Sequence, residues 1–259
     1  MNILKRISIL FIILLSLTSC GSHPDNTYGT TSGSTGNPNV KVEEERSSAA
    51  PESAPSRTRL DVPYISQEGL LPTGCELVSA MMVLAYYGEN PTLEETLDHL
   101  KTANLTLNNQ GEICGPSPEE AFIGDPRSAG GYGCYPPVIV NLMGQLLPQG
   151  RKAVETSGTS LPDLAETYLP RGIPVLVWAT IGMMETYPTS TWQLTDESGR
   201  LIGKTYTWQA NEHCLVLIGY DENSFYFNDP WRSRGVVAYD RNLAEGRYDD
   251  LGDRSLVVE

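Results

Sequence analysis

Residues 60–67 read Leu-Asp-Val-Pro-Tyr-Ile-Ser-Gln, and residues 72–76 read Pro-Thr-Gly-Cys-Glu. We expect a short strand at residues 61–65 and a loop containing Gly and Pro at residues 68–74. From Cys75 onward the sequence predicts a helix, because apolar residues recur at helical spacing. Four of them fall on one face of that helix: Leu77, Met81, Leu84 and Ala85. We expect the rest of the domain to be organised around this strand, loop and helix.

Cys75 is placed on the first turn of the predicted helix. The positive end of the helix dipole favours a thiolate there, and the thiolate is the nucleophilic form of cysteine. Gln67, a few residues upstream, could bring an amide N–H to the same point. A lone cysteine is more often a small buried apolar residue, so the catalytic interpretation depends on residues further along the chain.

The N-terminal residues 1–19 have the pattern of an export signal. Lys5 and Arg6 form a positive region, and residues 7–17 form an apolar core too short to span a bilayer. The segment ends Leu-Thr-Ser-Cys at Cys20, which resembles the lipobox of bacterial lipoproteins, where the signal is cut before the cysteine and the cysteine is lipidated. Cleavage by the ordinary signal peptidase is the alternative. In both cases we expect an extracytoplasmic protein, held at the membrane by lipid chains in the first case.

Residues 20–58 have the composition of a disordered tether, rich in Gly, Ser, Thr, Asn, Pro and Glu. Residues 59–259 are then the size of one folded domain. The formal charge is −14, and it becomes −16 when Lys5 and Arg6 leave with the signal. Such an acidic protein is repelled by nucleic acid, so we expect no nucleic-acid partner. We also expect a monomer without a cofactor.

The domain shows helical patterns first and strand patterns afterwards, which is typical of an α+β fold. Helices are predicted at residues 93–101, 137–147 and 161–169. Strands are predicted at residues 173–181, 213–220, 224–228 and 235–239, with a hairpin at 191–208 that turns at 197–199. Between the helices, residues 102–137 form a long Gly-, Pro- and Asn-rich stretch, and a loop of that length in a compact domain is usually functional or cross-linked.

The chain has three histidines, and one of them is a candidate catalytic base. His23 lies in the tether, and His99 lies on a charged helix where a solvated surface position is expected. His213 begins a predicted strand, and Asp229 follows the next one, where neighbouring strands would bring its carboxylate beside the imidazole. Such a carboxylate fixes the imidazole tautomer and stabilises the imidazolium. Taken alone, each residue would be read as structural.

These features together resemble the papain-like cysteine peptidases. The resemblance is closer to cysteine peptidase family 39, whose best-known members remove double-glycine leader peptides from bacteriocin precursors. It is closest to the C39-like branch of secreted and lipid-anchored proteins. That branch carries segments similar to Val-Pro-Tyr-Ile-Ser-Gln (62–67), Pro-Thr-Gly-Cys-Glu-Leu (72–77), Phe-Asn-Asp-Pro-Trp (227–231) and the stretches 122–126 and 131–134. The resemblance extends over residues 60–237.

The resemblance implies a papain-like fold, with an N-terminal helical half that carries the nucleophile helix and a C-terminal antiparallel sheet. It implies Cys75 as nucleophile, His213 as general base and then general acid, and Asp229 as the residue that orients His213. Asn228 is the alternative orienting residue, because papain uses Asn. Gln67 and the Cys75 N–H would donate to the oxyanion, a contribution of about 3 kcal/mol per donor. Exporter-type members of the family carry this domain on a membrane transporter. The present sequence shows no transporter, so we do not expect leader-peptide processing.

The remaining cysteines need a separate interpretation. Cys114 and Cys134 could form a disulfide that staples residues 102–137. Cys214 follows His213 on a strand and so is predicted to face the core. A zinc site made from these cysteines and His213 is a rival, but the sequence has no Cys-x-x-Cys and no close pair of histidines, so we expect no metal.

Two functions remain open from the sequence. The first is a lipid-anchored cysteine peptidase that hydrolyses peptide bonds of a peptide or protein substrate through an acyl-thioenzyme, or an amidase or transpeptidase with the same chemistry. The second is a catalytically silent papain-like binding or scaffold domain on the cell surface. The presence of all the expected catalytic side chains favours the first. Four aromatic residues could line a peptide-binding cleft near His213 or could belong to the core: Trp192, Tyr206, Trp208 and Trp231.

Overall fold

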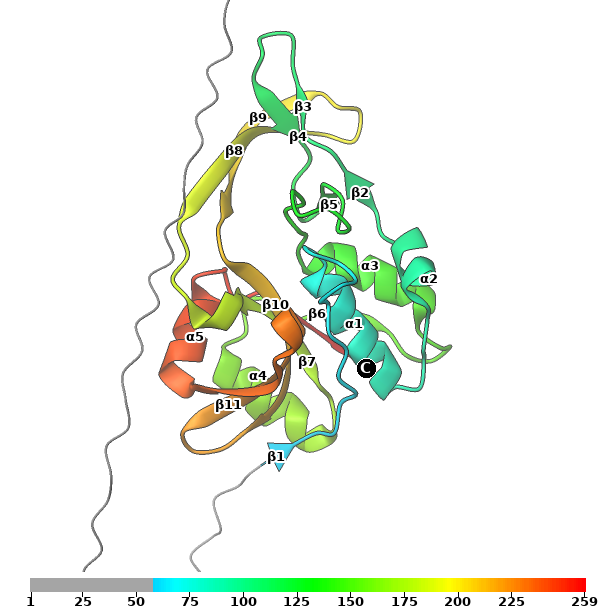
Figure 1. Ribbon diagram of the computed structural model, residues 1–259, viewed down its shortest axis with the longest axis vertical. Coiled ribbons are helices and arrows are strands. Elements are labelled where there is room, and N and C mark those ends of the chain that lie inside the picture. Colours follow the sequence, from blue (N-terminus) through cyan, green and yellow to red (C-terminus); the bar gives the residue numbers. More distant parts are fainter. Residues whose placement is uncertain (1–57) are drawn as a thin grey trace, which may run out of the picture. The chain divides into compact units, whose positions relative to one another are not determined.

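A computed structural model describes residues 58–259, apart from the side chain of Arg232 (Figure 1). The predicted signal segment, Cys20 and the predicted tether up to residue 57 lie outside the described residues. Within residues 58–259, no helix combines the length and the apolar character needed to cross a membrane.

A seven-stranded sheet forms the centre of the domain (Figure 1). Its strands follow the order β12-β11-β10-β7-β13-β6, with β1 paired to β10, and every pairing is antiparallel. The strands are β1 (Thr58–Arg59), β6 (Ala153–Glu155), β7 (Val175–Thr180), β10 (Glu212–Tyr220), β11 (Ser224–Asp229), β12 (Gly235–Asp240) and β13 (Ser255–Val258). The predicted C-terminal antiparallel sheet is therefore confirmed.

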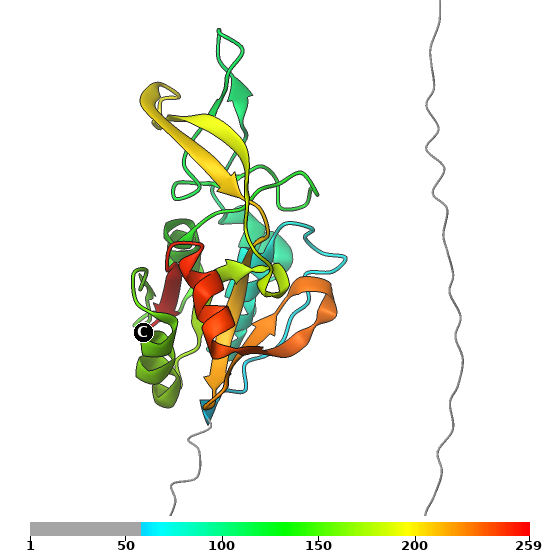
Figure 2. The same cartoon turned by 90° about the vertical axis from the view of Figure 1, so that its left-hand side faces the viewer.

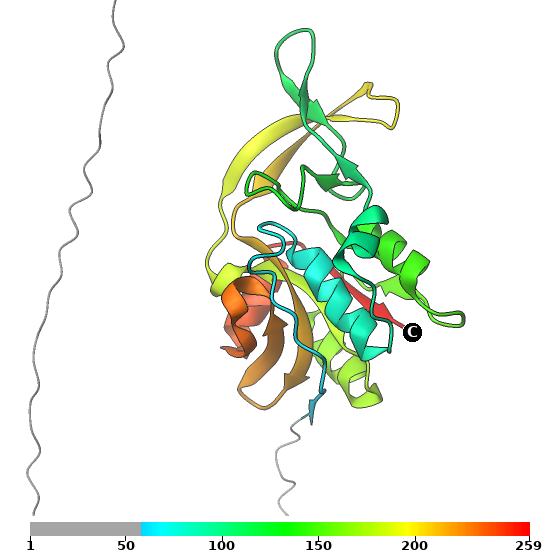
Figure 3. The ribbon, with the colours of Figure 1, turned by 45° about the vertical axis from the view of Figure 1, so that its right-hand side comes forward.

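Helices cover both faces of this sheet. They are α1 (Cys75–Tyr86), α2 (Leu93–Asp98), α3 (Pro136–Leu146), α4 (Leu161–Tyr168) and α5 (Arg241–Asp249). One core cluster joins α1 and α3 to one face of the sheet, and a second joins α4 and α5 to the other. Figure 1 shows α1 and α5 on opposite sides of β10 and β7, and Figure 3 shows α1 beside α3. The helical half that was expected to carry Cys75 thus lies against the sheet that carries His213.

The central strands β7 and β10 are buried on both faces, which explains their nearly continuous apolar sequences. Alternate residues of β10 contribute to the two core clusters, Cys214 and Val216 to one and Leu215 and Leu217 to the other. The prediction that Cys214 faces the core is confirmed, because its side chain is fully buried.

Helix α1 is buried more completely than its sequence pattern suggested. It contacts β10, β7, α2 and α3, and nine of its residues are buried. Of the four residues predicted to form its apolar face, Leu77 and Leu84 are buried, but Met81 and Ala85 are partly exposed. The single apolar face was wrong because neighbours on several sides cover the helix.

A four-stranded sheet, which we call the arm, extends away from the seven-stranded sheet (Figures 1 and 2). Its strands are β3 (Thr106–Leu107), β4 (Ile113–Gly115), β8 (Pro188–Thr195) and β9 (Leu201–Gln209). The predicted hairpin is β8 and β9. Nearby, β2 (Thr102–Ala103) pairs with β5 (Phe122–Ile123). The stretch at 102–137 therefore contains short strands in place of one long irregular loop.

The predicted strand at residues 61–65 is wrong. This segment runs beside the sheet without a ladder of its own, and Pro63 cannot donate a backbone hydrogen bond. It is held instead by a bond from Leu60 N to Ile218 O (2.7 Å) and one from Asn228 Nδ2 to Val62 O (3.0 Å).

The predicted N-terminus of the 93–101 helix is confirmed at α2. Thr92 Oγ1 accepts from Glu95 N (3.2 Å), and Glu95 Oε2 accepts from Thr92 N (2.8 Å), which is a capping box. The predictions of α3 and α4 were correct to within one residue at each end. Strands β6 and β13 and helix α5 were not predicted.

Candidate active site

His213 and Asp229 form a buried pair where β10 and β11 lie side by side. His213 Nε2 lies 2.7 Å from Asp229 Oδ1, and each side chain is about 1% exposed. Asp229 Oδ1 also accepts from Trp231 N (2.9 Å), and Arg234 Nη1 forms an ion pair with Asp229 Oδ2 at 3.6 Å. The carboxylate is therefore fixed from several directions and holds the imidazole in one orientation.

The structure distinguishes Asp229 from Asn228. Val216 of β10 pairs with Asn228 of β11, so strand alternation turns Asn228 to the α1 side and Asp229 to the side shared with His213. Asn228 Nδ2 donates to Val62 O at 3.0 Å and so holds the N-terminal segment of the domain. Asp229 alone of the two contacts the histidine.

Pairing through Nε2 leaves Nδ1 of His213 for other chemistry, and within residues 58–259 this nitrogen has no hydrogen-bond partner. Nδ1 is the ring nitrogen nearer to its own backbone. The next backbone N–H, that of Cys214, donates to Cys75 Sγ at 3.4 Å. The sulfur of Cys75 therefore lies beside the His213–Cys214 peptide.

Cys75 is the first residue of α1, as predicted, and its side chain is buried. Its thiol donates to Glu76 Oε2 at 3.4 Å, and no hydrogen bond joins it to His213 in the described part of the chain. Burial, and then the carboxyl groups of Glu76 and Glu212, raise the pKa of the Cys75 thiol well above its ordinary value, although the Cys214 N–H opposes them. In this arrangement desolvation and the nearby carboxyls oppose the thiolate that the helix dipole was expected to favour.

Glu76 and Glu212 complete the surroundings of the thiol, and the sequence analysis missed both. Cys75 Sγ and one carboxyl oxygen from each glutamate lie within 4.8 Å of one another, and all three residues are buried. Glu76 Oε1 accepts from Cys134 N at 2.7 Å. Burial raises the pKa of Glu76 to about 7, and burial together with Glu76 raises the pKa of Glu212 well above its ordinary value. Their sequence signal was position alone: one follows Cys75 and the other precedes His213.

Gln67 lies in the loop in front of α1, as expected, and is buried. Its Nε2 donates to Leu71 O (3.2 Å) and Pro72 O (3.3 Å), so its amide hydrogens are directed at the loop and not at Cys75. Its backbone N–H donates to Pro230 O at 3.0 Å. This last bond ties the loop before α1 to the turn that follows Asp229.

A small apolar pocket of about 220 Å³ lies at this junction, lined by Gln67, Leu71, Pro72 and Trp231 among others. The ring of Trp231 meets that of His213 edge to face, with ring centres 6.4 Å apart. The other three aromatic residues considered from the sequence pack together with Tyr132 and Tyr135, so they belong to the core near the base of the arm: Trp192, Tyr206 and Trp208.

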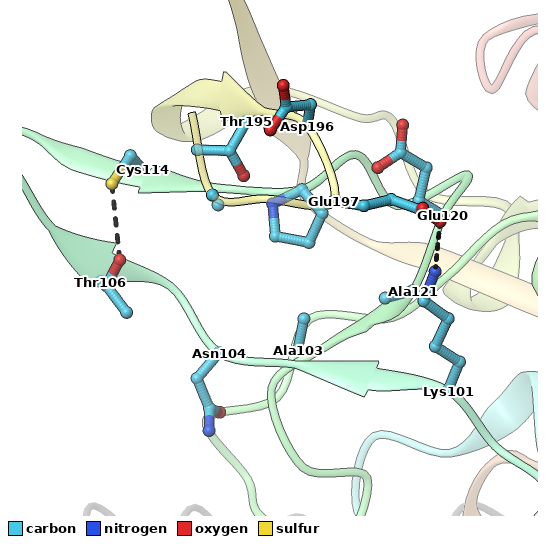
Figure 4. Close-up of a pocket in the computed structure, with 13 residues that line it drawn as sticks. Lys101, Ala103, Asn104, Thr106, Cys114, Glu120, Ala121, Thr195, Asp196 and Glu197 are labelled. Atoms are coloured by element: carbon cyan, nitrogen blue, oxygen red, sulfur yellow. Dashed lines mark hydrogen bonds and ion pairs between the residues drawn. The ribbon is translucent and has the colours of Figure 1, made fainter. Parts of the chain in front are cut away.

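A larger pocket of about 480 Å³ lies between the turn of the β8–β9 hairpin and the segment around β2 (Figure 4). Its lining includes Lys101, Glu120, Asp196 and Glu197 and none of the candidate catalytic residues. It is thus separate from the His213–Asp229 pair.

The disulfide that the sequence left possible is absent, since Cys114 and Cys134 both carry free thiols. Cys114 lies on β4 of the arm, where its Sγ is 3.4 Å from Thr106 Oγ1. Cys134 lies in the core beside α1, held through its backbone N–H by Glu76 and through its carbonyl by Trp178 Nε1 (2.8 Å). The two belong to different parts of the domain.

Comparisons with known proteins show which family the chain is similar to. The model of the Peptidase_C39 like family matches residues 59–256. The uncharacterized protein YvpB of Bacillus subtilis (strain 168) is 28% identical over 191 residues, which are 73% of this chain and 70% of that protein. The crystal structure of a candidate C39-like peptidase from Bacillus anthracis has a TM-score of 0.66 and 28% identity, covering 78% of this chain and 97% of that one. A double glycine motif protease from an AMS/PCAT transporter, solved with its leader peptide, has a TM-score of 0.43 and 18% identity over 79% of this chain and 94% of that one.

Proposed function

The chain belongs to the Peptidase_C39 like family, and on this premise we propose that it is a cysteine peptidase with Cys75 as nucleophile and His213 as general base. The single observation that carries the proposal is the 2.7 Å bond between His213 Nε2 and Asp229. This bond leaves Nδ1 as the basic nitrogen, on a residue whose next backbone N–H contacts Cys75 Sγ. Nucleophile, base and orienting carboxylate are thereby gathered at one end of β10.

The reaction begins when the Cys75 thiol turns from Glu76 toward His213 Nδ1 and transfers its proton there. The sulfur attacks the substrate carbonyl, and the oxyanion is stabilised by N–H groups of the first turn of α1, which have no intrahelical acceptors. The His213 imidazolium then protonates the leaving amine, and a water molecule activated by His213 hydrolyses the thioester. Asp229 holds the ring and balances its charge throughout.

Gln67 is proposed as an additional oxyanion donor, as the family resemblance implies. In the structure its Nε2 hydrogens are bound to the carbonyls of Leu71 and Pro72. Donation to an oxyanion therefore requires one of these bonds to open when substrate enters. The apolar pocket beside Trp231 suits an apolar substrate side chain next to the scissile bond.

We also propose that the mature protein is extracytoplasmic and anchored through lipids on Cys20, with residues 20–58 as its tether. The substrate is then a peptide or protein reached from outside the cytoplasm by a monomeric enzyme. The acidic composition disfavours nucleic acid and anionic surfaces as partners.

The test is covalent labelling of the full chain with an epoxide probe for cysteine peptidases, followed by intact mass. We expect one adduct on the wild type and on Cys114→Ala, which removes a thiol outside the site. We expect none on Cys75→Ala, and about a hundredfold slower labelling of His213→Ala, within the range for loss of a general base. An unlabelled wild type, or equal labelling without His213, would favour the silent binding domain.

A further inference from the structure

The surroundings of Cys75 contain two buried carboxyl groups that peptide hydrolysis by a Cys-His-Asp site does not require. Glu76 lies on α1 and is fully buried, and Glu212 lies on β10 and is about 8% exposed. Cys75 Sγ lies with one carboxyl oxygen of each within a 4.8 Å group. Two carboxyl groups this close and this well buried repel each other when both are ionised, which favours a proton on one of them.

Glu76 is fixed in place by contacts on both of its oxygens. Oε2 accepts from the Cys75 thiol at 3.4 Å, and Oε1 accepts from Cys134 N at 2.7 Å. Gly133 closes the site from the same side. A Cβ at this position would lie 2.5 Å from Glu76 Oε1 and 3.2 Å from Glu212 Oε2, so the backbone approaches both carboxyls as only glycine allows.

Glu212 has a different environment, because its Oε1 is buried without a hydrogen-bond partner. The cation that acts on it is Arg254, whose Nη2 is already paired with Glu119 Oε1 at 2.8 Å. Its guanidinium also lies over the ring of Tyr135, at 3.7 Å from the ring centre. A neutral, protonated carboxyl at Glu212 agrees with this setting.

Other ionisable groups face the pair from each neighbouring element. They are Cys75 on α1, Cys134 and Tyr135 ahead of α3, Tyr206 on β9, Cys214 on β10 and Arg254 ahead of β13. The cysteines and tyrosines in this set are neutral when protonated, whereas Arg254 is positively charged. Among the charged groups around the Cys75 sulfur, the carboxyls of Glu76 and Glu212 act on it most strongly.

We propose that Glu76 and Glu212 share one proton and together hold Cys75 as a resting thiol, with Glu76 as the positioning residue that accepts its S–H. In the active form the thiol proton leaves Sγ for His213 Nδ1, while the shared proton stays with the two carboxyls. The inference rests on the proposed function in one respect, that Cys75 is the nucleophile. The raised pKa values of Cys75, Glu76 and Glu212 agree with it.

The test measures the rate of Cys75 alkylation by iodoacetamide against pH, using the full chain and intact mass. Glu76→Gln replaces the carboxyl that accepts the S–H with a neutral amide that can donate an N–H to the thiolate, so we expect the midpoint of the profile to fall. A fall of one pH unit raises the rate at neutral pH about tenfold. We expect Glu212→Gln to act in the same direction. Glu185→Gln, which removes one exposed carboxylate by the same change, should leave the profile unchanged.

Unchanged midpoints in both Glu76→Gln and Glu212→Gln would overturn the proposal. Stoichiometric Zn²⁺ retained by the purified wild type and lost in Glu76→Gln would also overturn it, because a cation and not a proton would then neutralise the pair. A measurement on the wild type does not depend on the folding of any variant. Its infrared spectrum at neutral pH should contain the C=O band of a buried protonated carboxyl, and absence of that band would contradict the shared proton.

The same experiment separates this inference from the proposed function. If His213→Ala slows alkylation while the glutamate variants behave as wild type, the enzyme proposal stands and the inference fails. If the glutamate variants shift the midpoint while His213→Ala has no effect, the inference stands and the catalytic pair fails.

Discussion

Asn228 and Asp229 occupy adjacent positions on β11, and the sequence left open which of them orients His213. Either side chain can accept a hydrogen bond from an imidazole, so chemistry alone could not decide. The register of β10 against β11 decides it, because Val216 faces Asn228 and the strand then turns Asp229 to the side of His213. Asn228 instead donates to the buried carbonyl of Val62.

Substitution of these two residues should therefore affect different properties. Asp229→Asn keeps the shape but loses the charge that stabilises the imidazolium, so we expect probe labelling of Cys75 to slow by about a hundredfold with little loss of stability. Asn228→Ala leaves the Val62 carbonyl buried without its donor, so we expect about 1–3 kcal/mol lower unfolding free energy and nearly unchanged labelling. Labelling rates and urea denaturation of both variants check this, and slow labelling of Asn228→Ala alone would reverse the assignment.

Helix α1 and strand β10 are joined directly at the site by both backbone groups of Cys214. Its N–H donates to Cys75 Sγ at 3.4 Å, and its carbonyl accepts from Ser79 Oγ at 3.0 Å. These two contacts are one helical turn apart on α1, so they fix both the height and the rotation of the helix against the strand. The position of the nucleophile relative to His213 is thus a property of this pair of elements.

Removal of the Ser79 hydroxyl should test that link. We expect Ser79→Ala to lower the unfolding free energy by about 1 kcal/mol and to slow labelling of Cys75, because the helix loses one of its two registering contacts. Thr96→Val is the matched control, since Thr96 is buried on α2 and its Oγ1 donates to Thr92 O at 2.9 Å. It should lose similar stability and label as wild type. Equal labelling of both variants would mean that other packing alone sets the register.

On the scale of the whole domain, the sequence predicted what local pattern controls and missed what distant packing controls. The long apolar strands β7 and β10 could be predicted, because a strand buried on both faces has a distinctive composition. The placement of His213 and Asp229 on neighbouring strands could be predicted from the same pattern. Strands β6 and β13 are three and four residues long and owe their existence to pairing with distant partners, so no local signal marked them.

For Cys75, too, the sequence predicted the local feature and missed the one that depends on distant packing. Its place at the start of a helix was local and could be predicted, but its protonation depends on burial beside Glu76 and Glu212. Carboxylates at the start of a helix and of a strand normally face water, and only the assembled domain shows that these two do not. The possible disulfide between Cys114 and Cys134 is absent for a related reason, because the sequence does not show that the two cysteines lie in different parts of the domain.

The buried carboxyl pair should also make the stability of the domain depend on pH. Burial raises the pKa of Glu76 to about 7 in the folded protein, whereas an unfolded chain has the ordinary value of about 4.3. The folded state therefore binds more protons between these pH values, and this contribution to stability, fully present at lower pH, is lost as pH rises toward 7. A shift of this size corresponds to about 3.7 kcal/mol over the whole titration.

Because other groups also titrate in this window, the informative quantity is the difference between the wild type and Glu76→Gln, which cannot titrate at this position. We expect the unfolding free energy of the wild type, relative to the variant, to fall by about 3 kcal/mol between pH 4.5 and pH 7. Urea denaturation of both proteins at several pH values measures this. Glu185→Gln, at an exposed position, should show no such change relative to the wild type. A pH-independent difference between the wild type and Glu76→Gln would mean that Glu76 is ionised in the folded protein at all these pH values, and the resting thiol would then need another cause.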